Sequence, residues 1–261
     1  MLQQKHLDGI VELCHDVSAR IHGQVTGDIS VEATLYNVVA FKLFGYALNT
    51  FKSVFYLLPH TVYEQAMALH RTLWETGLNF EWISRDPEKR AQRFLQFTIV
   101  EQRKFLRKRI ETARRAGDSS AVLSLTKELR EFENLLNERL SAYKYTDTKR
   151  KTKYRDRFSG PSLEQVVREV GGDWLDEYDR DYILGCMSSH GSPGAVLFPL
   201  VDTSPNFQAS RLKDVERSAL VGAMAIEVIS RCYRLYLPVI GKEDEAFLRE
   251  LPARVRAIPG V

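Results

Sequence analysis

Polar residues in one stretch of the chain have the types and spacing of a reactive cluster. Arg71, Glu75 and Asn79 are four positions apart, so on a helix they form one polar stripe, and His70 precedes it. A guanidinium can neutralise a phosphate, a carboxylate can orient the guanidinium, and an amide can bind a substrate. An intrahelical Arg–Glu pair beside a hydrogen-bonded amide explains the same pattern without any ligand.

A second polar group follows more than a hundred residues later, where a predicted helix ends. Tyr182 is followed by Ser188, Ser189 and His190, and then by glycines and a proline. Histidine is the usual side chain for proton transfer near neutral pH, and hydroxyls and glycines beside it let a substrate approach. If the two helices pack together, His190 faces the guanidinium and carboxylate of the first group. The alternative is a histidine that caps the C-terminal carbonyls of its own helix.

The elements that position these groups are helices. Apolar residues recur at three- and four-residue spacing almost throughout, which indicates an all-α fold, a helical bundle of about seven to eight helices. The longer helices are predicted over residues 2–21, 31–58, 61–83, 87–116, 119–143, 173–187 and 212–237, with shorter ones over 163–170 and 243–257. Asp118 is a predicted N-cap, and Ser162 with Gln165 matches a capping box.

The middle of the chain has a different pattern. Residues 101–115 are very charged, and residues 119–143 carry apolar side chains in a narrow seam. A narrow seam is typical of a two-helix arm, so we expect residues 101–143 to form an antiparallel helical hairpin that projects from the bundle. We expect a single all-α domain, 1–261, whose bundle core is 31–100 and 161–240.

Residues 144–162 form a predicted basic linker with seven lysines and arginines against two aspartates, net +5. Tyrosines and a phenylalanine alternate with the cations, a composition that suits single-stranded nucleic acid, because cations bind phosphates and rings stack on bases. A flexible, solvated connection explains the same composition. The candidate nucleic-acid-binding residues are Lys149, Arg150, Lys151, Lys153 and Arg155.

Composition narrows the function classes. Hydrophobic residues make up 44% and charged residues 27%, which are ordinary globular values, and the net charge of +3 is mild. Three scattered cysteines without a CxxC pair predict neither a disulfide framework nor a thiolate zinc site. No nucleotide-binding glycine loop or metal-binding motif occurs, so we expect no cofactor and no metal. The acidic cluster around Asp176 and Glu177 is interpreted as a solvated helix face.

The chain shows no signal-peptide pattern at residues 1–6 and no apolar run near the ~20 residues of a membrane helix. We therefore expect a cytoplasmic protein with no membrane association.

Two stretches resemble a known family. Residues 68–75 and 82–94, together with Tyr182 and Ser188–Ser192, resemble the core of a bacterial family known as domain of unknown function 5677, and the resemblance spans roughly 31–190 plus the following long helix. That family has a helical layout similar to the HEPN-like proteins of bacterial toxin–antitoxin and anti-phage systems. Many HEPN proteins are dimeric, metal-independent ribonucleases with an Arg-x(4–6)-His motif. This chain departs from the motif, because Arg180, the nearest upstream arginine, is too far from His190.

The resemblance implies a HEPN-like protein that cleaves or binds RNA in a defence or stress pathway. As an enzyme it would be a metal-independent ribonuclease in which His190 is the general acid and base, Arg71 stabilises the phosphate charge and Glu75 orients Arg71. The expected substrate-binding residues are Asn79, Tyr182 and Ser189.

A non-enzymatic interaction module is the alternative. In that case the hairpin docks a protein partner or completes a homo-oligomer, for which a homodimer is expected, and the polar cluster only fixes the packing of the core. A small-molecule or nucleotide sensor, with its pocket between the helices at 61–83 and 173–187, is a third hypothesis.

Overall fold

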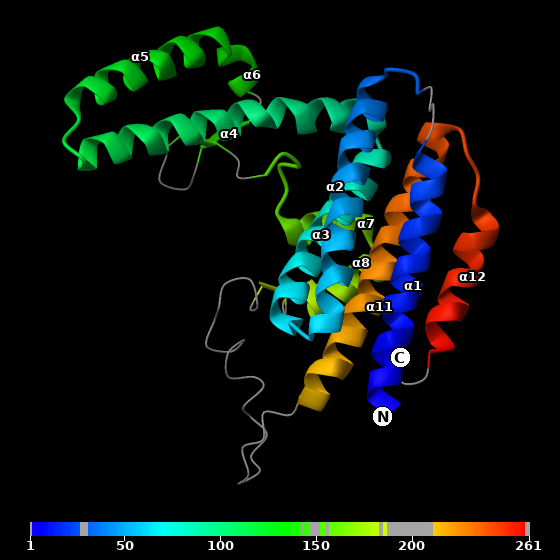
Figure 1. Ribbon diagram of the computed structural model, residues 1–261. Coiled ribbons are helices and arrows are strands. Elements are labelled where there is room, and N and C mark those ends of the chain that lie inside the picture. Colours follow the sequence, from blue (N-terminus) through cyan, green and yellow to red (C-terminus); the bar gives the residue numbers. More distant parts are fainter. Residues whose placement is uncertain are drawn as a thin grey trace. The chain divides into compact units, whose positions relative to one another are not determined.

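The computed structural model describes residues 2–26, 31–141, 143–146, 152–154, 157–182, 185–186 and 211–258. It confirms the all-α fold (Figure 1). The chain forms two compact units, which we call the bundle unit (1–85 with 167–261) and the hairpin unit (86–166). Each unit has its own packing and is described in turn.

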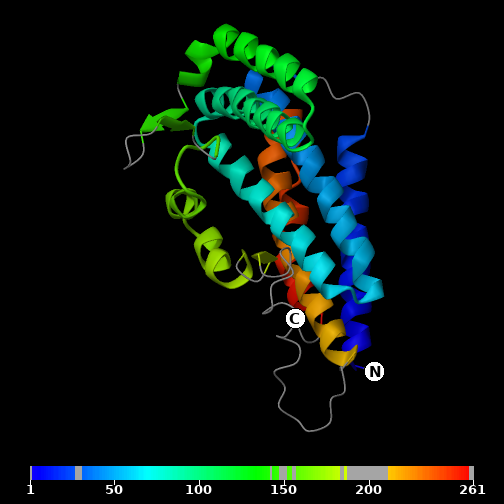
Figure 2. The same cartoon turned by 90° about the vertical axis from the view of Figure 1, so that its left-hand side faces the viewer.

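Four long helices make up most of the bundle unit, and Figure 2 shows them from the side. They are α1 (Leu2–Val25), α2 (Leu35–Leu57), α3 (Tyr63–Ser84) and α11 (Arg211–Tyr236). Helix α11 packs against the other three, and α2 packs against α3. Shorter elements complete the unit: η1 (Leu58–His60), α8 (Asp173–Glu177), the π-helical turn η2 (Tyr178–Tyr182), η4 (Leu237–Ile240) and α12 (Glu245–Arg256).

Close helix approach in this unit depends on a glycine of α11. A Cβ at Gly222 would lie 2.3 Å from Ile10 Cγ2 and 2.8 Å from Leu58 Cδ1, so no larger residue fits without displacing α1. Near the end of α11, Phe44 of α2 stacks on Tyr236 with ring centroids 4.2 Å apart. These contacts fix α11 as the helix around which the unit packs.

A buried carboxylate links the start of helix α12 to the bundle. Asp244, just before α12, accepts hydrogen bonds from Arg20 Nε at 2.9 Å and Nη2 at 2.6 Å, and from the Tyr233 hydroxyl at 3.0 Å. The hydrogen bond from Arg20 lowers the pKa of Asp244, burial opposes this, and the Tyr233 hydroxyl adds to the lowering. The ionised carboxylate therefore ties α12 to α1 and α11.

We expect Asp244→Asn to lower the free energy of unfolding by about 1–3 kcal/mol at neutral pH, because charge-assisted hydrogen bonds are lost. The carboxyl has a lower pKa in the folded state than in the unfolded chain, so its contribution is complete above about pH 4 and is lost as pH falls further. Urea unfolding of both proteins between pH 3 and pH 8 measures this. A stability difference that stays constant down to pH 3 would contradict the assignment.

The hairpin unit contains α4 (Pro87–Arg115), α5 (Ser119–Leu135) and α6 (Asn137–Ser141). Helices α4 and α5 run antiparallel, as predicted, around a turn at Gly117, whose φ of 72° suits glycine. The predicted N-cap is confirmed, because the Asp118 side chain accepts from the Ala121 N–H. The apolar pattern assigned residues 87–100 to the bundle core. In the structure they form the first half of α4 and belong to the hairpin unit.

The seam of the hairpin is a small apolar cluster closed by an ion pair. Arg103 Nε donates to Glu133 Oε1 at 2.6 Å across α4 and α5, and the Arg103 side chain is only 8% exposed. The buried members of the cluster are Leu106, Ile110, Leu125 and Leu129. Two of these leucines belong to the predicted seam, so the narrow stripe in the sequence is confirmed as the helix–helix contact.

The expected linker contains two short strands, which the sequence analysis did not predict. Strand β1 (Lys144–Thr146) pairs antiparallel with β2 (Thr152–Tyr154). Two aromatic residues beside them are buried: Tyr143 donates to the Arg93 carbonyl at 2.8 Å, and Phe158 packs edge-on to Phe94. Those two rings are therefore unavailable for stacking on bases.

Helix α7 (Leu163–Val170) follows and coincides with its predicted range. The capping box is confirmed, since the Ser162 N–H donates to Gln165 Oε1 and the Gln165 N–H donates to Ser162 Oγ. Among the described residues no helix is long and apolar enough to span a membrane.

Candidate functional site

The bundle unit brings Tyr182 against the polar stripe of α3. The Tyr182 hydroxyl donates to Glu75 Oε1 at 3.0 Å and accepts from Arg71 Nη2 at 3.2 Å. The same Nη2 lies 3.2 Å from Glu75 Oε1, so the predicted Arg–Glu pair exists and includes a third member. Groups more than a hundred residues apart in the sequence thus share one cluster, which we call the Arg71 cluster.

Two further contacts fix the orientation of Arg71. Its Cζ lies 5.1 Å from the centre of the Tyr182 ring, within cation–π distance. The backbone of Gly185 lies against its stem, because a Cβ on Gly185 would be 2.7 Å from Arg71 Cβ. With 21% of the Arg71 side chain exposed, a ligand can reach a guanidinium that is already oriented.

The protonation states follow from the same contacts. Burial raises the pKa of Tyr182, the hydrogen bond from Arg71 opposes this, and Glu75 and Cys186 raise it further. Burial disfavours the charge on Arg71, but Tyr182, Cys186 and Glu75 outweigh it and raise the pKa of the guanidinium. At neutral pH Arg71 is therefore a cation and Tyr182 is a neutral phenol that donates a hydrogen bond to Glu75, so Tyr182 suits binding and positioning, not general-base catalysis.

The other residues predicted for the α3 site lie in different environments. Asn79 is half-buried, and its Oδ1 is buried with no hydrogen-bond partner among the described residues, which leaves an acceptor available near the stripe. His70 is 1% exposed and belongs to the core.

Several predicted residues fall outside the described part of the chain. Ser188, Ser189 and His190 do so, as do Lys149, Arg150, Lys151 and Arg155. Only the backbone of Lys153 is described, in β2 opposite Tyr145. Their proposed roles remain predictions.

The sequence analysis missed the interactions that hold Tyr182 in place. The chain has three tryptophans, and each indole N–H donates to a glutamate across the contact between α3 and residues 169–177. The pairs are Trp74–Glu177 at 2.8 Å, Trp174–Glu81 at 2.6 Å and Trp82–Glu169 at 3.0 Å. Donors and acceptors lie on both sides of this contact, so α3 and residues 169–177 are joined in one register.

Glu177 corrects the interpretation of the acidic cluster as a solvated face. Asp176 and Asp179 are exposed, but Glu177 is 7% exposed, accepts from Trp74 and pairs with Arg231 Nη2 at 2.6 Å. A buried carboxylate needs such partners, because an unpaired one would cost several kcal/mol. The sequence did contain one indication that Glu177 is buried. Trp174, an apolar residue, lies three positions earlier and therefore on the same helical face.

Aromatic rings on either side of Tyr182 fix its position. Tyr178 and Tyr182, four residues apart in η2, stack with centroids 5.2 Å apart, and Trp74 lies 5.0 Å from Tyr182. The sequence predicted a regular helix from 173 to 187, whereas residues 178–182 form a π-helical turn. Such turns are frequent at functional sites because they redirect side chains.

We expect the three members of the Arg71 cluster to be energetically coupled. Tyr182→Phe and Glu75→Gln should each lower the free energy of unfolding by about 1 kcal/mol, and the double variant should lose less than the sum by 0.5 kcal/mol or more. Glu131→Gln, which breaks the exposed Lys127–Glu131 pair, is the control and should change little. Additive losses in urea unfolding would show that Tyr182 and Glu75 act independently.

Comparison with known proteins gives one match. Residues 37–207, more than half of the chain, match the model of a family of unknown function, DUF5677. No curated protein and no solved structure matches the chain. Among the described residues no three histidine, cysteine, aspartate or glutamate side chains are grouped so that they could hold a metal ion.

Proposed function

We propose that this chain, which belongs to the DUF5677 family, binds RNA at the Arg71 cluster and, with His190, cleaves it as part of a bacterial defence or toxin–antitoxin system in the cytoplasm. The observation that carries the proposal is the preorganised guanidinium of Arg71. Glu75 and Tyr182 both engage Nη2, and the Tyr182 ring lies against Cζ. A planar cation held in one orientation favours recognition of a phosphate.

Chain length supports a role for His190 at this cluster. Gly185 touches Arg71, and His190 is five residues further along the chain. Five residues span at most about 18 Å when fully extended, so this length of chain is compatible with a His190 imidazole that acts at the cluster. In the cleavage reaction His190 takes the proton of the 2′-hydroxyl as the 2′-oxygen bonds to phosphorus, and the resulting imidazolium gives that proton to the departing 5′-oxygen as the P–O5′ bond breaks.

The test separates binding from cleavage. We expect Arg71→Ala to weaken binding of a labelled single-stranded RNA about tenfold or more, because a hydrogen-bonded charge contact is lost, and Arg71→Lys to recover only part of it. His190→Ala should keep binding and lose cleavage in the presence of EDTA. Arg254→Ala, which breaks an exposed pair with Asp16, is the control.

Fluorescence anisotropy and gel analysis of the RNA measure the two properties. Unchanged RNA affinity in Arg71→Ala would refute the binding role, and full cleavage by His190→Ala would refute the mechanism.

A second candidate function is self-association through the hairpin unit. Three large apolar side chains are exposed there: Phe105 at 60%, Leu123 at 76% and Leu135 at 83%. Contiguous exposed apolar patches mark protein contacts, so this candidate requires these side chains to meet a second copy of the chain together.

For this candidate, we expect a Leu123→Ser, Leu135→Ser variant to fold normally, because neither side chain is packed, and to elute as a monomer. Size-exclusion chromatography with light scattering measures the mass. An unchanged mass relative to the wild-type dimer would reject the hairpin contact.

A further inference from the structure

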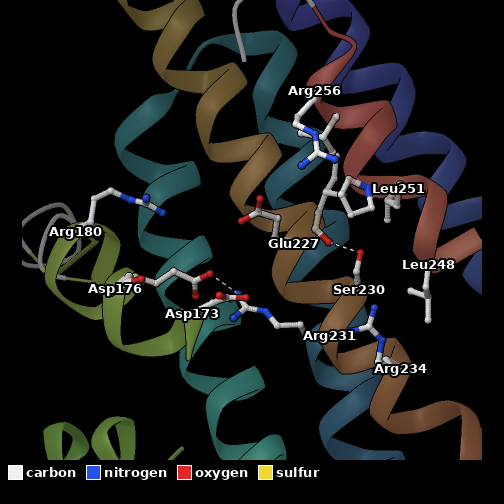
Figure 3. Close-up of a pocket in the computed structure, with 14 residues that line it drawn as sticks. Asp173, Asp176, Arg180, Glu227, Ser230, Arg231, Arg234, Leu248, Leu251 and Arg256 are labelled. Atoms are coloured by element: carbon white, nitrogen blue, oxygen red, sulfur yellow. Dashed lines mark hydrogen bonds and ion pairs between the residues drawn. The ribbon is translucent and has the colours of Figure 1, made fainter. Parts of the chain in front are cut away.

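A hollow in the bundle unit lies apart from the residues of the Arg71 cluster. Its volume is about 550 Å³, within the roughly 300–1,000 Å³ range of small-molecule sites. Three elements enclose it: α8 with η2, the middle of α11, and α12 (Figure 3). We call it the α11–α12 pocket.

One wall of the pocket is apolar and the others are charged. Helix α12 contributes Leu248, Leu251, Pro252 and Val255; Pro252 is exposed and the other three are buried beside it, so the apolar surface that a flat ring can contact is centred on Pro252. Asp173, Asp176 and Arg180 come from α8 and η2, on the opposite side in Figure 3. The pocket thus offers an apolar face and distinct polar ends to one ligand.

Cations without an ion-pair partner lie toward α12. Arg234 of α11 and Arg256 of α12 both line the pocket, and neither makes an ion pair with a described residue. Arg231 is paired with Glu177 through Nη2, but its Nη1 is buried and has no hydrogen-bond acceptor among the described residues. Two helices therefore present arginine donors whose complement is an anionic group with several oxygens.

Arg231 is held rigidly for such a role. Its Cζ lies 4.0 Å from the centre of the Trp174 ring, and Glu177 fixes the other side of the guanidinium. An oriented donor loses little side-chain entropy when a ligand binds.

The carboxylate of Glu227 lies between the charged wall and the arginines, near the centre of the close-up. No described residue forms an ion pair with it. Loss of hydration in the pocket and the nearby charge of Glu177 raise its pKa, although Arg231 and Arg180 oppose this and part of the residue stays exposed. The oxygens of this carboxylate can accept hydrogen bonds from the amino group of a ligand.

We propose that the α11–α12 pocket binds a nucleotide whose phosphate lies at Arg234 and Arg256, whose base covers the α12 wall and whose exocyclic amino group donates to Glu227. Four features of the pocket fit a nucleotide: its volume, the arginines that α11 and α12 contribute, the apolar wall of α12, and the Glu227 carboxylate, which has no ion-pair partner among the described residues. A simple anion would leave the wall and Glu227 unused, and an amino acid would leave most of the wall uncovered.

The experiment is calorimetric titration of the full chain with AMP, CMP, GMP, UMP, adenosine and inorganic phosphate. We expect the three nucleotides with an amino group to bind more tightly than UMP, adenosine or phosphate. Arg234→Ala and Arg256→Ala should each weaken binding of those nucleotides about tenfold, because each removes a charged hydrogen bond to the phosphate. Glu227→Gln should weaken AMP binding and leave UMP binding unchanged.

A matched control completes the design. Arg249→Ala removes an exposed arginine of α12 that does not line the pocket, and it should bind nucleotides as wild type does. Because Arg234 and Arg256 are exposed, their variants should keep the wild-type melting temperature. Absence of nucleotide binding, phosphate binding equal to that of AMP, or full AMP affinity in the Arg234→Ala, Arg256→Ala double variant would overturn the proposal.

Discussion

Hydrogen bonds from indole N–H groups to carboxylates are the interaction on which the rest of the bundle unit depends. Residues 171–182 contain two short helical elements, α8 and η2, and follow the short helix α7. Isolated helices this short are unstable in water, so their conformation must come from tertiary contacts. The three tryptophan–glutamate pairs supply those contacts, and each one satisfies a polar group that burial would otherwise penalise.

The consequence is one segment with two faces in different surroundings. Residues 173–182 carry Tyr182 to Arg71 and Glu75 on one side, and they line the α11–α12 pocket with Asp173, Asp176 and Arg180 on another. Glu177 belongs to both arrangements, because it accepts from Trp74 and holds Arg231. The close packing of Trp174 on α3 requires Gly77, where a Cβ would lie 2.8 Å from the indole ring.

Helical periodicity made most of the fold predictable. The predicted helices at 163–170 and 87–116 agree with α7 and α4 almost residue for residue, because glycine, proline and capping residues mark their ends. The strands at 144–146 and 152–154 were not predicted, since three-residue strands carry little periodic signal and depend on pairing with each other.

The candidate site was predictable only in part. The spacing of Arg71 and Glu75 specified their ion pair, because it is local to one helix. The contact with Tyr182 requires the helix at 61–83 and residues 173–187 to pack together, which the sequence allowed only as a condition. The role of Glu177 could not be read from its neighbours, because its partners Trp74 and Arg231 are remote in sequence and its acidic surroundings resemble an exposed helix face.

The most direct measurement is amide hydrogen exchange across residues 173–182 in Trp74→Phe, which removes one indole donor but keeps an aromatic ring. If the indole–carboxylate bonds hold this segment, its amides should exchange about tenfold faster than in wild type while α1 keeps its protection, because a hydrogen bond to a charged group is lost. Arg254→Ala, which breaks an exposed pair elsewhere in the same unit, should leave the segment unchanged. Wild-type exchange at residues 173–182 in Trp74→Phe would contradict the account.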